Sequence, residues 1–253
     1  MNQRSDSRGR VALVTGGSGA IGGEISRCLA RAGVRVAVAW HQNADAAQAV
    51  VDLVNSAGGE ALAIRLDQRD PGDRARVLAQ VEAELGVVQV LVAAAVAWPT
   101  ADDSWEQLVS DLVNNLAGPI ACVESALPGM RRAGWGRVVT ISTDMVDQPM
   151  PATAAYTAAK GGLEAATRVW AVREARHGVL CNVVRPGFTL TDKVLRTPGL
   201  GQPAVDAETA RTPNARICTP QDVAQVVAFL ATDTNTHVNG QTVSVGGGRE
   251  LSR

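Results

Sequence analysis

The chain alternates, from its first apolar run to its last, between two kinds of segment. Short runs of β-branched and other apolar residues are separated by longer stretches with apolar residues at helical spacing, such as Val77, Leu78, Val81 and Leu85. Continuous apolar strands separated by helices indicate a parallel sheet that is covered on both faces. The seven expected strands lie at 11–14, 34–39, 61–66, 87–92, 137–141, 179–184 and 242–245.

This alternation predicts a doubly wound, Rossmann-type α/β fold with seven parallel strands and helices on both faces. The chain has 253 residues, of which 46% are hydrophobic and 19% charged, so it can bury one substantial core. Because no linker-like segment divides it, we expect a single domain over residues 10–253, preceded by a disordered polar tail at 1–9. Ligands of such sheets bind at the carboxyl ends of the strands.

The charge balance and the hydropathy exclude several classes of function. With 24 Lys+Arg against 25 Asp+Glu and no basic cluster, the chain is not expected to bind nucleic acid. The longest apolar run, at 90–98, is too short to cross a bilayer, and the polar start of the chain does not resemble a secretory signal. We therefore expect a cytoplasmic protein without a membrane partner. The four cysteines are scattered, with no histidine at ligand spacing, and are expected to be buried free thiols with no metal.

The first loop, TGGSGAIGG over 15–23, follows the first strand and opens a helix. Glycines allow a tight turn there and let a pyrophosphate approach the helix N-terminus, whose free N–H groups favour anions. A glycine-rich turn alone is a weak signal, and its place between strand and helix strengthens it. The predicted nucleotide contacts in the turn are Gly16, Ser18, Gly19, Ala20, Ile21 and Gly22.

The most informative pair is Tyr156 and Lys160, which share a helix face because residues i and i+4 lie one turn apart. A nearby ammonium stabilises a phenolate and is expected to lower the pKa of the tyrosine. Such a tyrosine can donate a proton to a carbonyl oxygen as hydride arrives at the carbon. Tyr156 is the only tyrosine in the chain.

Together the TGxxxGxG-like turn and the YxxxK pair resemble the short-chain dehydrogenase/reductase family. The resemblance extends to Asn239-Gly240 before the last strand and so covers nearly the whole chain. It implies that Tyr156 is the proton donor and that Lys160 orients the nicotinamide ribose. Thr143, thirteen positions before the tyrosine, would hold the substrate oxygen, whereas strand alternation points Ser142 the other way.

The resemblance also implies that Asn115 anchors a water relaying protons to the lysine. A buried amide bonded to the backbone is the alternative for this residue, and Asn114 stands beside it.

The resemblance implies a nicotinamide cofactor, and the end of the second strand bears on which one. An acidic residue there would bind a free ribose 2′-hydroxyl, but this chain has Trp40, His41 and Gln42. We therefore predict NADP(H), with NAD(H) as the alternative because the basic residue common in the family's turn is replaced by Gly19. Asp67 matches the family's adenine-contacting aspartate, with Gln68 next to it; a helix N-cap before the next proline is a compatible role.

Further cofactor contacts are implied after the fourth and sixth strands, and residues 188–218 match the family's substrate lid. The residues concerned are Ala93, Ala94, Ala95, Pro186, Gly187, Thr189 and Thr191. Three features depart from the family pattern. Ala20 replaces the middle glycine of the turn, Thr143 carries an added methyl, and the segment 93–96 replaces Asn-Asn-Ala-Gly.

The chain is most similar to the β-ketoacyl carrier-protein reductase branch, and it also resembles tailoring ketoreductases of aromatic, angucycline-type polyketides, a class tied to antibiotic biosynthesis. Members that act on carrier-bound chains have basic residues at two docking positions, which here hold Gly134 and His177, so a free, diffusible ketone is favoured. Arg131, Arg132 and Arg137 lie close to these positions and would supply part of the docking charge. An apolar wall would suit a bulky substrate, although ordinary core packing explains such residues equally well. The proposed wall consists of Val96, Trp98, Met145, Val146 and Phe188, with Pro149 and Met150 beside them.

The predicted function is thus an NADPH-dependent ketoreductase that reduces a bulky ketone to a secondary alcohol. Two alternatives remain: a 3-oxoacyl carrier-protein reductase, and a cofactor-binding regulatory protein with little turnover. The resemblance further implies a homotetramer, with one interface formed by the helices around 103–131 and 153–176 and another by the last strand.

Overall fold

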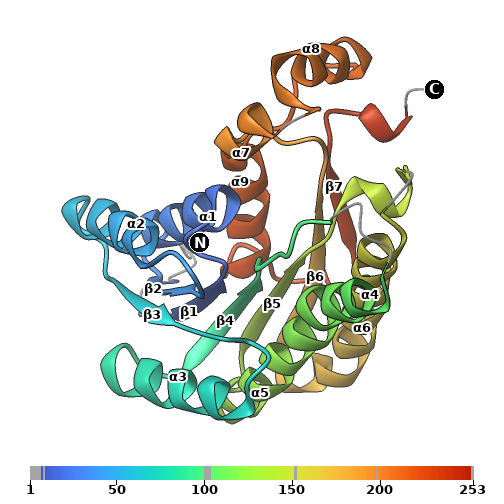
Figure 1. Cartoon of the computed structure of the whole chain (residues 1–253). Helices are drawn as coiled ribbons and strands as arrows, with labels where there is room; N and C mark the ends of the chain where they lie inside the picture. Colours follow the sequence, from blue (N-terminus) through green and yellow to red (C-terminus); the bar gives the residue numbers. More distant parts are fainter. Residues whose placement is uncertain (1–6, 8, 100–103, 151–152, 198, 252–253) are drawn as a thin grey trace.

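In the part of the chain that the structure describes, seven parallel strands form one sheet in the order β3-β2-β1-β4-β5-β6-β7 (Figure 1). The computed structural model describes residues 7, 9–99, 104–150, 153–197 and 199–251. The strands are β1 (Val11–Thr15), β2 (Arg35–Trp40), β3 (Ala61–Arg65), β4 (Val88–Ala93), β5 (Gly136–Ile141), β6 (Val179–Pro186) and β7 (Thr242–Val245). The predicted Rossmann-type sheet is confirmed, and each expected strand is found to within two residues at either end.

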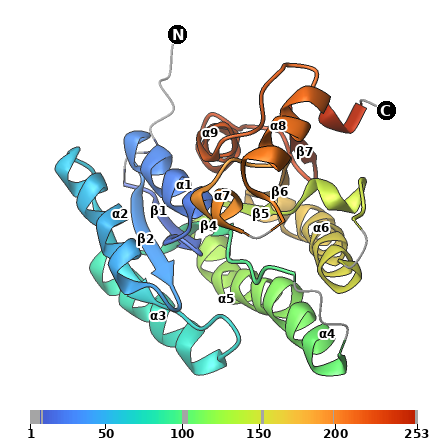
Figure 2. The same cartoon turned by 45° about the horizontal axis from the view of Figure 1, so that its top comes forward.

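The helices cover both faces of this sheet (Figures 1 and 2). One face packs against α1 (Ala20–Arg31), α2 (Ala44–Ser56) and α9 (Pro220–Ala231). The other packs against α3 (Pro71–Glu84), α5 (Gly118–Ala133) and α6 (Ala154–Glu174). The short α4 (Trp105–Leu112) continues through a π-helical turn, Val113–Ala117, into α5 and lies against α6. The result is a three-layer α/β domain.

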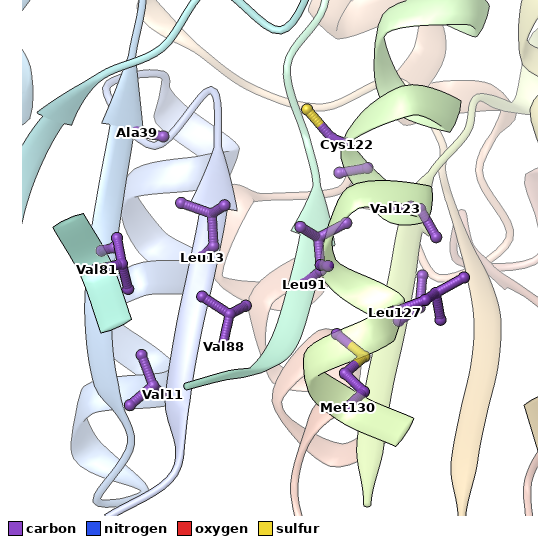
Figure 3. Packing of buried hydrophobic residues seen from close by; sticks show 14 of the residues in the cluster. Val11, Leu13, Ala39, Val81, Val88, Leu91, Cys122, Val123, Leu127 and Met130 are labelled. Carbon is purple, nitrogen blue, oxygen red and sulfur yellow. The ribbon is translucent and has the colours of Figure 1, made fainter. Parts of the chain in front are cut away.

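Strand alternation divides the core into two halves. On β1, Leu13 faces the layer of α3 and α5, while Val14 faces the layer of α1 and α9. Figure 3 shows part of the first half, with Leu13 on β1, Leu91 on β4 and, on α5, Leu127 and Met130. The four cysteines are buried and free, as predicted. Among the described residues, no helix combines the length and the hydropathy that a bilayer crossing requires.

The loop after β3 corrects one prediction about capping. The N-cap of α3 is Asp70, whose side chain accepts a hydrogen bond from the amide of Asp73, with Pro71 at the first helical position. Asp67 lies three residues before the cap and is not the cap residue. Its carboxylate instead bonds to Arg69.

The segment 188–218 forms a small layer of its own beside the carboxyl end of the sheet (Figure 2). It contains α7 (Asp192–Arg196) and α8 (Gly201–Arg211) and is closed at its base by a bridge between Thr189 and Cys218. Its own apolar cluster comprises Val194, Val205 and Ile217, with Phe188 and Leu190 packed against it.

The first residues are partly held by the domain. Ser7, which falls within the predicted tail, is buried, and its hydroxyl donates to the Asp233 carboxylate at 3.2 Å. Residues 1–6 and 8 of that tail lie outside the described part of the chain.

Candidate active site

The glycine-rich turn after β1 is built by close backbone contacts that leave no room for side chains. Gly16 has a φ of +67°, and a Cβ there would lie 2.7 Å from the Cα of Ala95. A Cβ on Gly22 would lie 2.2 Å from the carbonyl oxygen of Gly16. These distances are far below van der Waals contact, so the turn requires glycine at both positions.

The N-terminus of α1 points its free amides out of this turn. Its N-cap, Gly19, has no side chain to cap the helix, and the first helical bond runs from the amide of Gly23 to the carbonyl of Gly19 at 2.7 Å. The amides of Ala20, Ile21 and Gly22 bond to no other described residue. Such amides suit an anion. Because Ala20 is exposed, its added methyl crowds nothing in the chain itself.

The segment after β4 keeps its place without the amide side chains that the family pattern has there. The hydroxyl of Thr15 accepts hydrogen bonds from the amides of Ala94 and Ala95 at 3.2 and 3.1 Å. Further along, the Asn115 side chain accepts from the amide of Ala97 and donates to its carbonyl, both at 3.0 Å. The side chains of Thr15 and Asn115 therefore hold the backbone of this loop in place.

Asn115 is fully buried in the π-helical turn and its amide is engaged by the backbone, as in the alternative named for it. The neighbouring Asn114 turns away to Ser110, while its carbonyl accepts a hydrogen bond from Gln68 at 2.7 Å. The two asparagines are thus clearly distinguished, and Asn115 is the one that faces the loop after β4.

The ends of β2 and β3 bring a charged cluster together. His41 lies 3.6 Å from the Asp67 carboxylate, and Arg69 holds the same carboxylate through two hydrogen bonds of 2.8 and 2.7 Å. These bonds to Arg69 hold the pKa of Asp67 well below its usual range. Trp40 and Gln42 flank His41, which is exposed. Arg69 was not predicted, although its position two residues after Asp67 in the sequence was a usable signal.

Tyr156 and Lys160 lie together at the start of α6, as their spacing predicts. Both are buried, and the Lys160 ammonium donates to the carbonyl of Ile141 at 2.9 Å, at the end of β5. The ammonium nitrogen lies 5.8 Å from the centre of the Tyr156 ring. The β5 end and the first turn of α6 therefore fix the pair.

The pKa values of this pair depart from their usual ranges in opposite directions. Burial raises the pKa of Tyr156 to about 12; the Thr143 hydroxyl lowers it and the Asp144 carboxylate raises it. Burial lowers the pKa of Lys160 to about 8. The expectation that the ammonium lowers the tyrosine pKa is wrong for the chain alone, because removal from water raises this pKa and the Asp144 carboxylate raises it further.

Two hydroxyl residues at the end of β5 separate as strand alternation predicts. The Thr143 hydroxyl is the one that interacts with Tyr156, and it donates to Asp144 at 3.3 Å. Ser142 faces the opposite way and donates to the Glu164 carboxylate at 2.6 Å. Thr143 is thus the hydroxyl that faces the tyrosine, and its methyl is accommodated.

Behind this site lies a buried ion pair that sequence reasoning missed. Glu164 is one helical turn beyond Lys160, and its two oxygens accept hydrogen bonds from Arg185 at 3.0 and 2.7 Å. The side chains are 4% and 11% exposed. Arg185 also pairs with Asp147 after β5, so it ties β6, α6 and the loop between β5 and α6 together. The spacing of Tyr156, Lys160 and Glu164 was the available signal.

The segment after β6 places its predicted contacts near the end of β7. The amide of Gly187 donates to the carbonyl of Val245 at 3.0 Å, and the Thr189 hydroxyl donates to the Gly187 carbonyl at 2.8 Å. Pro186 is buried at the end of β6. The Thr191 hydroxyl caps α7, accepting from the amide of Val194, so it is partly engaged by the chain.

The predicted apolar wall divides into two groups. Val96 and Trp98 are each 43% exposed, and the Lys193 ammonium of α7 lies 4.7 Å above the Trp98 ring. Phe188 packs instead into the apolar cluster of the segment 188–218. Met145 and Val146 are half-buried, Pro149 and Met150 exposed. Open apolar surface thus lies mainly on the loop after β4.

The positions compared with carrier docking lie elsewhere. Gly134 ends α5 and His177 precedes β6, so both are at the amino ends of their strands, roughly 15–20 Å along the sheet from Thr143. The expectation that they flank the entrance is wrong within one subunit. Arg131 is paired with Glu174, and the Arg137 guanidinium is buried against backbone carbonyls, so neither provides a free cation.

Comparison with known proteins extends the likeness over nearly the whole chain. Residues 16–250 match the family described as enoyl-(acyl carrier protein) reductase. A short-chain type dehydrogenase/reductase of Picea abies is 32% identical over 95% of this chain and 92% of its own. The 3-oxoacyl-[acyl-carrier-protein] reductase FabG of Staphylococcus aureus strain Mu50 is 31% identical over 94% and 97%.

Solved structures agree with these sequence relatives. The promiscuous reductase LugOII, which catalyses keto-reduction at C1 during lugdunomycin biosynthesis, has a TM-score of 0.89 at 30% identity and covers 98% of this chain and 100% of that one. A dehydrogenase/reductase from Sinorhizobium meliloti 1021 has a TM-score of 0.86 at 32% identity, covering 96% and 95%.

Proposed function

This chain belongs to the short-chain dehydrogenase/reductase family of oxidoreductases, and we propose that it is an NADPH-dependent ketoreductase acting on a bulky, free ketone of polyketide type. The observation that carries the proposal is the buried corner formed by Thr143, Tyr156 and Lys160, which lies at the same edge of the sheet as the uncapped N-terminus of α1.

The chain fits a dinucleotide cofactor at the turn after β1. The close contacts at Gly16 and Gly22 keep the backbone near the helix N-terminus, and the free amides of α1 would hold the diphosphate. At the other end, Asp67 would contact the adenine, once it gives up one bond to Arg69. NADPH bound in this way supplies a hydride to the carbonyl carbon.

Side chains of the protein then supply the proton that the ketone oxygen takes up. Thr143 would hold the ketone oxygen by its hydroxyl, and Tyr156 would donate its phenolic proton to that oxygen. A pKa of about 12 keeps the tyrosine protonated at neutral pH and therefore ready to donate. Lys160, with a pKa of about 8, can return a proton to the phenolate near neutral pH, and Asn115 would anchor the relay behind it.

NADPH is favoured over NADH by the residues after β2. Trp40, His41 and Gln42 offer no carboxylate to a free 2′-hydroxyl, and the nearby Asp67 is already neutralised by Arg69. His41 is exposed after β2, 3.6 Å from Asp67, and its imidazole would be available to a 2′-phosphate. NAD(H) remains the alternative cofactor.

A free, bulky ketone is supported by the exposed apolar side chains of Val96 and Trp98 and by the likeness to LugOII. The segment 188–218 would act as the lid, with Lys193 placed over Trp98. We further propose a cytoplasmic homotetramer, in which exposed apolar residues of α4 and α6, Trp105, Val169 and Val172, face a second copy. A 3-oxoacyl carrier-protein reductase is the second candidate, favoured by the likeness to FabG.

Oxidation of NADPH and of NADH by the purified protein tests the proposal. The substrates offered are fused-ring ketones, small ketones, quinones and thioester mimics, with Tyr156→Phe as the control. The Phe variant keeps the buried ring but removes the proton donor, so turnover should fall about 10²–10⁴-fold while the Kd for NADPH stays within about twofold.

Each other outcome points to a different function. Turnover of the thioester mimics alone would support the carrier-protein reductase. Tight cofactor binding without turnover of any substrate would support a regulatory protein that binds the cofactor, and equal turnover by Tyr156→Phe would contradict the catalytic role of the tyrosine.

A further inference from the structure

Asp144 is a carboxylate that the proposed mechanism does not use. It follows Thr143 directly, at the start of the short helix after β5, and is half-buried. One of its oxygens accepts the Thr143 hydroxyl proton at 3.3 Å. A Cβ on Gly187 would lie 3.8 Å from the other oxygen, so the carboxylate lies between the end of β5 and the end of β6.

The chain leaves part of the hydrogen-bonding capacity of this carboxylate free. A carboxylate can accept about four hydrogen bonds, and the described residues supply one from the Thr143 hydroxyl and one from the backbone amide of Asp144 itself. None of the described lysine, arginine or histidine side chains comes within 4.0 Å of it. The charge of Glu208, in the segment 188–218, also acts on Asp144, but Glu208 is paired with Arg249 at 2.9 Å.

Because Asp144 is half-buried, acceptor sites of its carboxylate that lack a hydrogen-bond donor are energetically unfavourable. Removal from water and the Glu208 carboxylate raise the pKa of Asp144, while the Thr143 hydroxyl, the Arg249 guanidinium and the residue's own backbone amide lower it. A half-buried acceptor with unused lone pairs, next to the hydroxyl that holds the reacting oxygen, is suited to a polar group of the substrate.

We propose that the Asp144 carboxylate is a substrate subsite that binds a hydroxyl group placed β to the ketone carbon, an ortho-phenolic hydroxyl included. The inference rests on the proposed function, which it narrows to one class of ketone. A ketone oxygen that accepts from Thr143 and a hydroxyl that donates to Asp144 would lie about 3 Å apart when the two hydrogen bonds, each about 2.7 Å long, run side by side, because the donor oxygen of Thr143 and the acceptor oxygen of Asp144 are 3.3 Å apart.

The subsite also couples recognition to the reaction. Thr143 has a single hydroxyl proton, and in this structure that proton goes to Asp144. A substrate hydroxyl that donates to the same oxygen of Asp144 competes with the Thr143 hydroxyl for that oxygen, and this favours turning the threonine proton toward the ketone oxygen. A ketone without the hydroxyl must compete with Asp144 for that proton.

The test compares 1-tetralone with 8-hydroxy-1-tetralone in the unmodified chain and in Asp144→Ala, by kcat/KM with NADPH. The unmodified chain should prefer the hydroxyketone about 10- to 100-fold more strongly than Asp144→Ala does, since hydrogen bonds to charged groups are worth that much. Taking the ratio of the two preferences removes the intrinsic difference in reactivity between the ketones. Asp144→Asn, a neutral acceptor of the same shape, should fall between the two.

Asp147→Ala is the matched control, because it removes an acid three residues along the same loop that pairs with Arg185 instead. It should keep the preference. Equal loss on both ketones in Asp144→Ala, or the same preference in all variants, would overturn the inference. Kd values for the two ketones from quenching of tryptophan fluorescence give the same comparison without turnover, so a failure of the proposed function is recognised separately by its lack of NADPH oxidation.

Discussion

Two regions at the carboxyl edge of the sheet are held in place by different interactions. The cradle, residues 15–23, contains no charged side chain and is shaped by backbone contacts at Gly16 and Gly22. The second region is the buried corner together with the ion pair behind it, and both are called the corner below: Thr143, Tyr156, Lys160, Glu164 and Arg185. Besides the tyrosine it holds three ionisable side chains, and two of these, Glu164 and Arg185, form an ion pair. The cradle depends on shape, while the corner depends on the pairing of charges.

The difference determines which kind of substitution destabilises each region. A side chain added to the cradle collides with backbone that cannot move aside. A substitution there leaves no unpaired charge, because the cradle has no charged side chain. In the corner, a substitution can leave a buried charge without its partner. That loss lowers the free energy of unfolding far more than the loss of a surface ion pair does. Each of the following changes tests one side of that contrast.

The largest effect is expected from Glu164→Ala. It leaves the Arg185 guanidinium, 11% exposed, with only the exposed carboxylate of Asp147 as a charged partner. The Ser142 hydroxyl loses its acceptor as well. We expect a loss of about 3–5 kcal/mol in the free energy of unfolding, measured by urea denaturation.

Glu164→Gln serves as the control, since it keeps the shape and one acceptor oxygen and should lose less. A loss below about 1 kcal/mol in Glu164→Ala would show that the corner does not depend on charge pairing, and the contrast with the cradle would disappear.

A second prediction concerns pH. Lys160 has a pKa of about 8 in the folded chain and about 10.4 when unfolded, so between these values the unfolded state binds more protons. The cost of burying its charge is therefore fully present below about pH 8 and is relieved as the pH rises toward 10.4. Stability relative to Lys160→Met should rise by about 2–3 kcal/mol over that window.

The comparison with Lys160→Met cancels the cysteines and Tyr156, whose raised pKa values destabilise both proteins at high pH. Unfolding free energies at pH 7, 8, 9 and 10 for the two proteins measure the effect. A constant difference between them would mean that the Lys160 ammonium is not desolvated in the folded chain.

The same contrast explains how much the sequence could predict. Strand runs, the glycine turn and the Tyr156–Lys160 spacing are local patterns, and the structure places all of them as expected. Arg185 and Glu164 are 21 positions apart, and their pairing depends on how β6 packs on α6. The spacing of Tyr156, Lys160 and Glu164 places Glu164 on the same helix face, but it does not identify Arg185 as the partner.

The effect of burial on the pKa of Tyr156, and the edge of the sheet at which Gly134 and His177 lie, could not be predicted from the sequence either. The pKa of Tyr156 was expected to fall beside an ammonium, and it rises because the hydroxyl is removed from water. Gly134 and His177 were assigned to the site entrance by their spacing from Thr143 and Tyr156, yet a position before a strand lies at the opposite edge from a position after it. Spacing along the chain does not specify the edge of the sheet.

The smallest expected effect, and the most direct test of the cradle, is Gly22→Ala. Both Gly22 and Gly23 lie in α1, where alanine in place of glycine gains up to about 1 kcal/mol in helix propensity. At Gly22 the new methyl lies 2.2 Å from the carbonyl oxygen of Gly16, whereas at Gly23 it lies 3.0 Å from the end of the Val50 side chain, which can rotate. We expect Gly22→Ala to be about 1–3 kcal/mol less stable than Gly23→Ala.

Because the two variants add the same group to the same helix, the difference between them isolates the contact with Gly16. The displaced turn should also weaken NADPH binding at least about tenfold in Gly22→Ala, a readout that stability alone does not supply. If both variants unfold at the same urea concentration and bind NADPH equally, the turn is deformable. The cradle would then resemble the corner in tolerating volume, and the contrast between shape and charge would hold only for the corner.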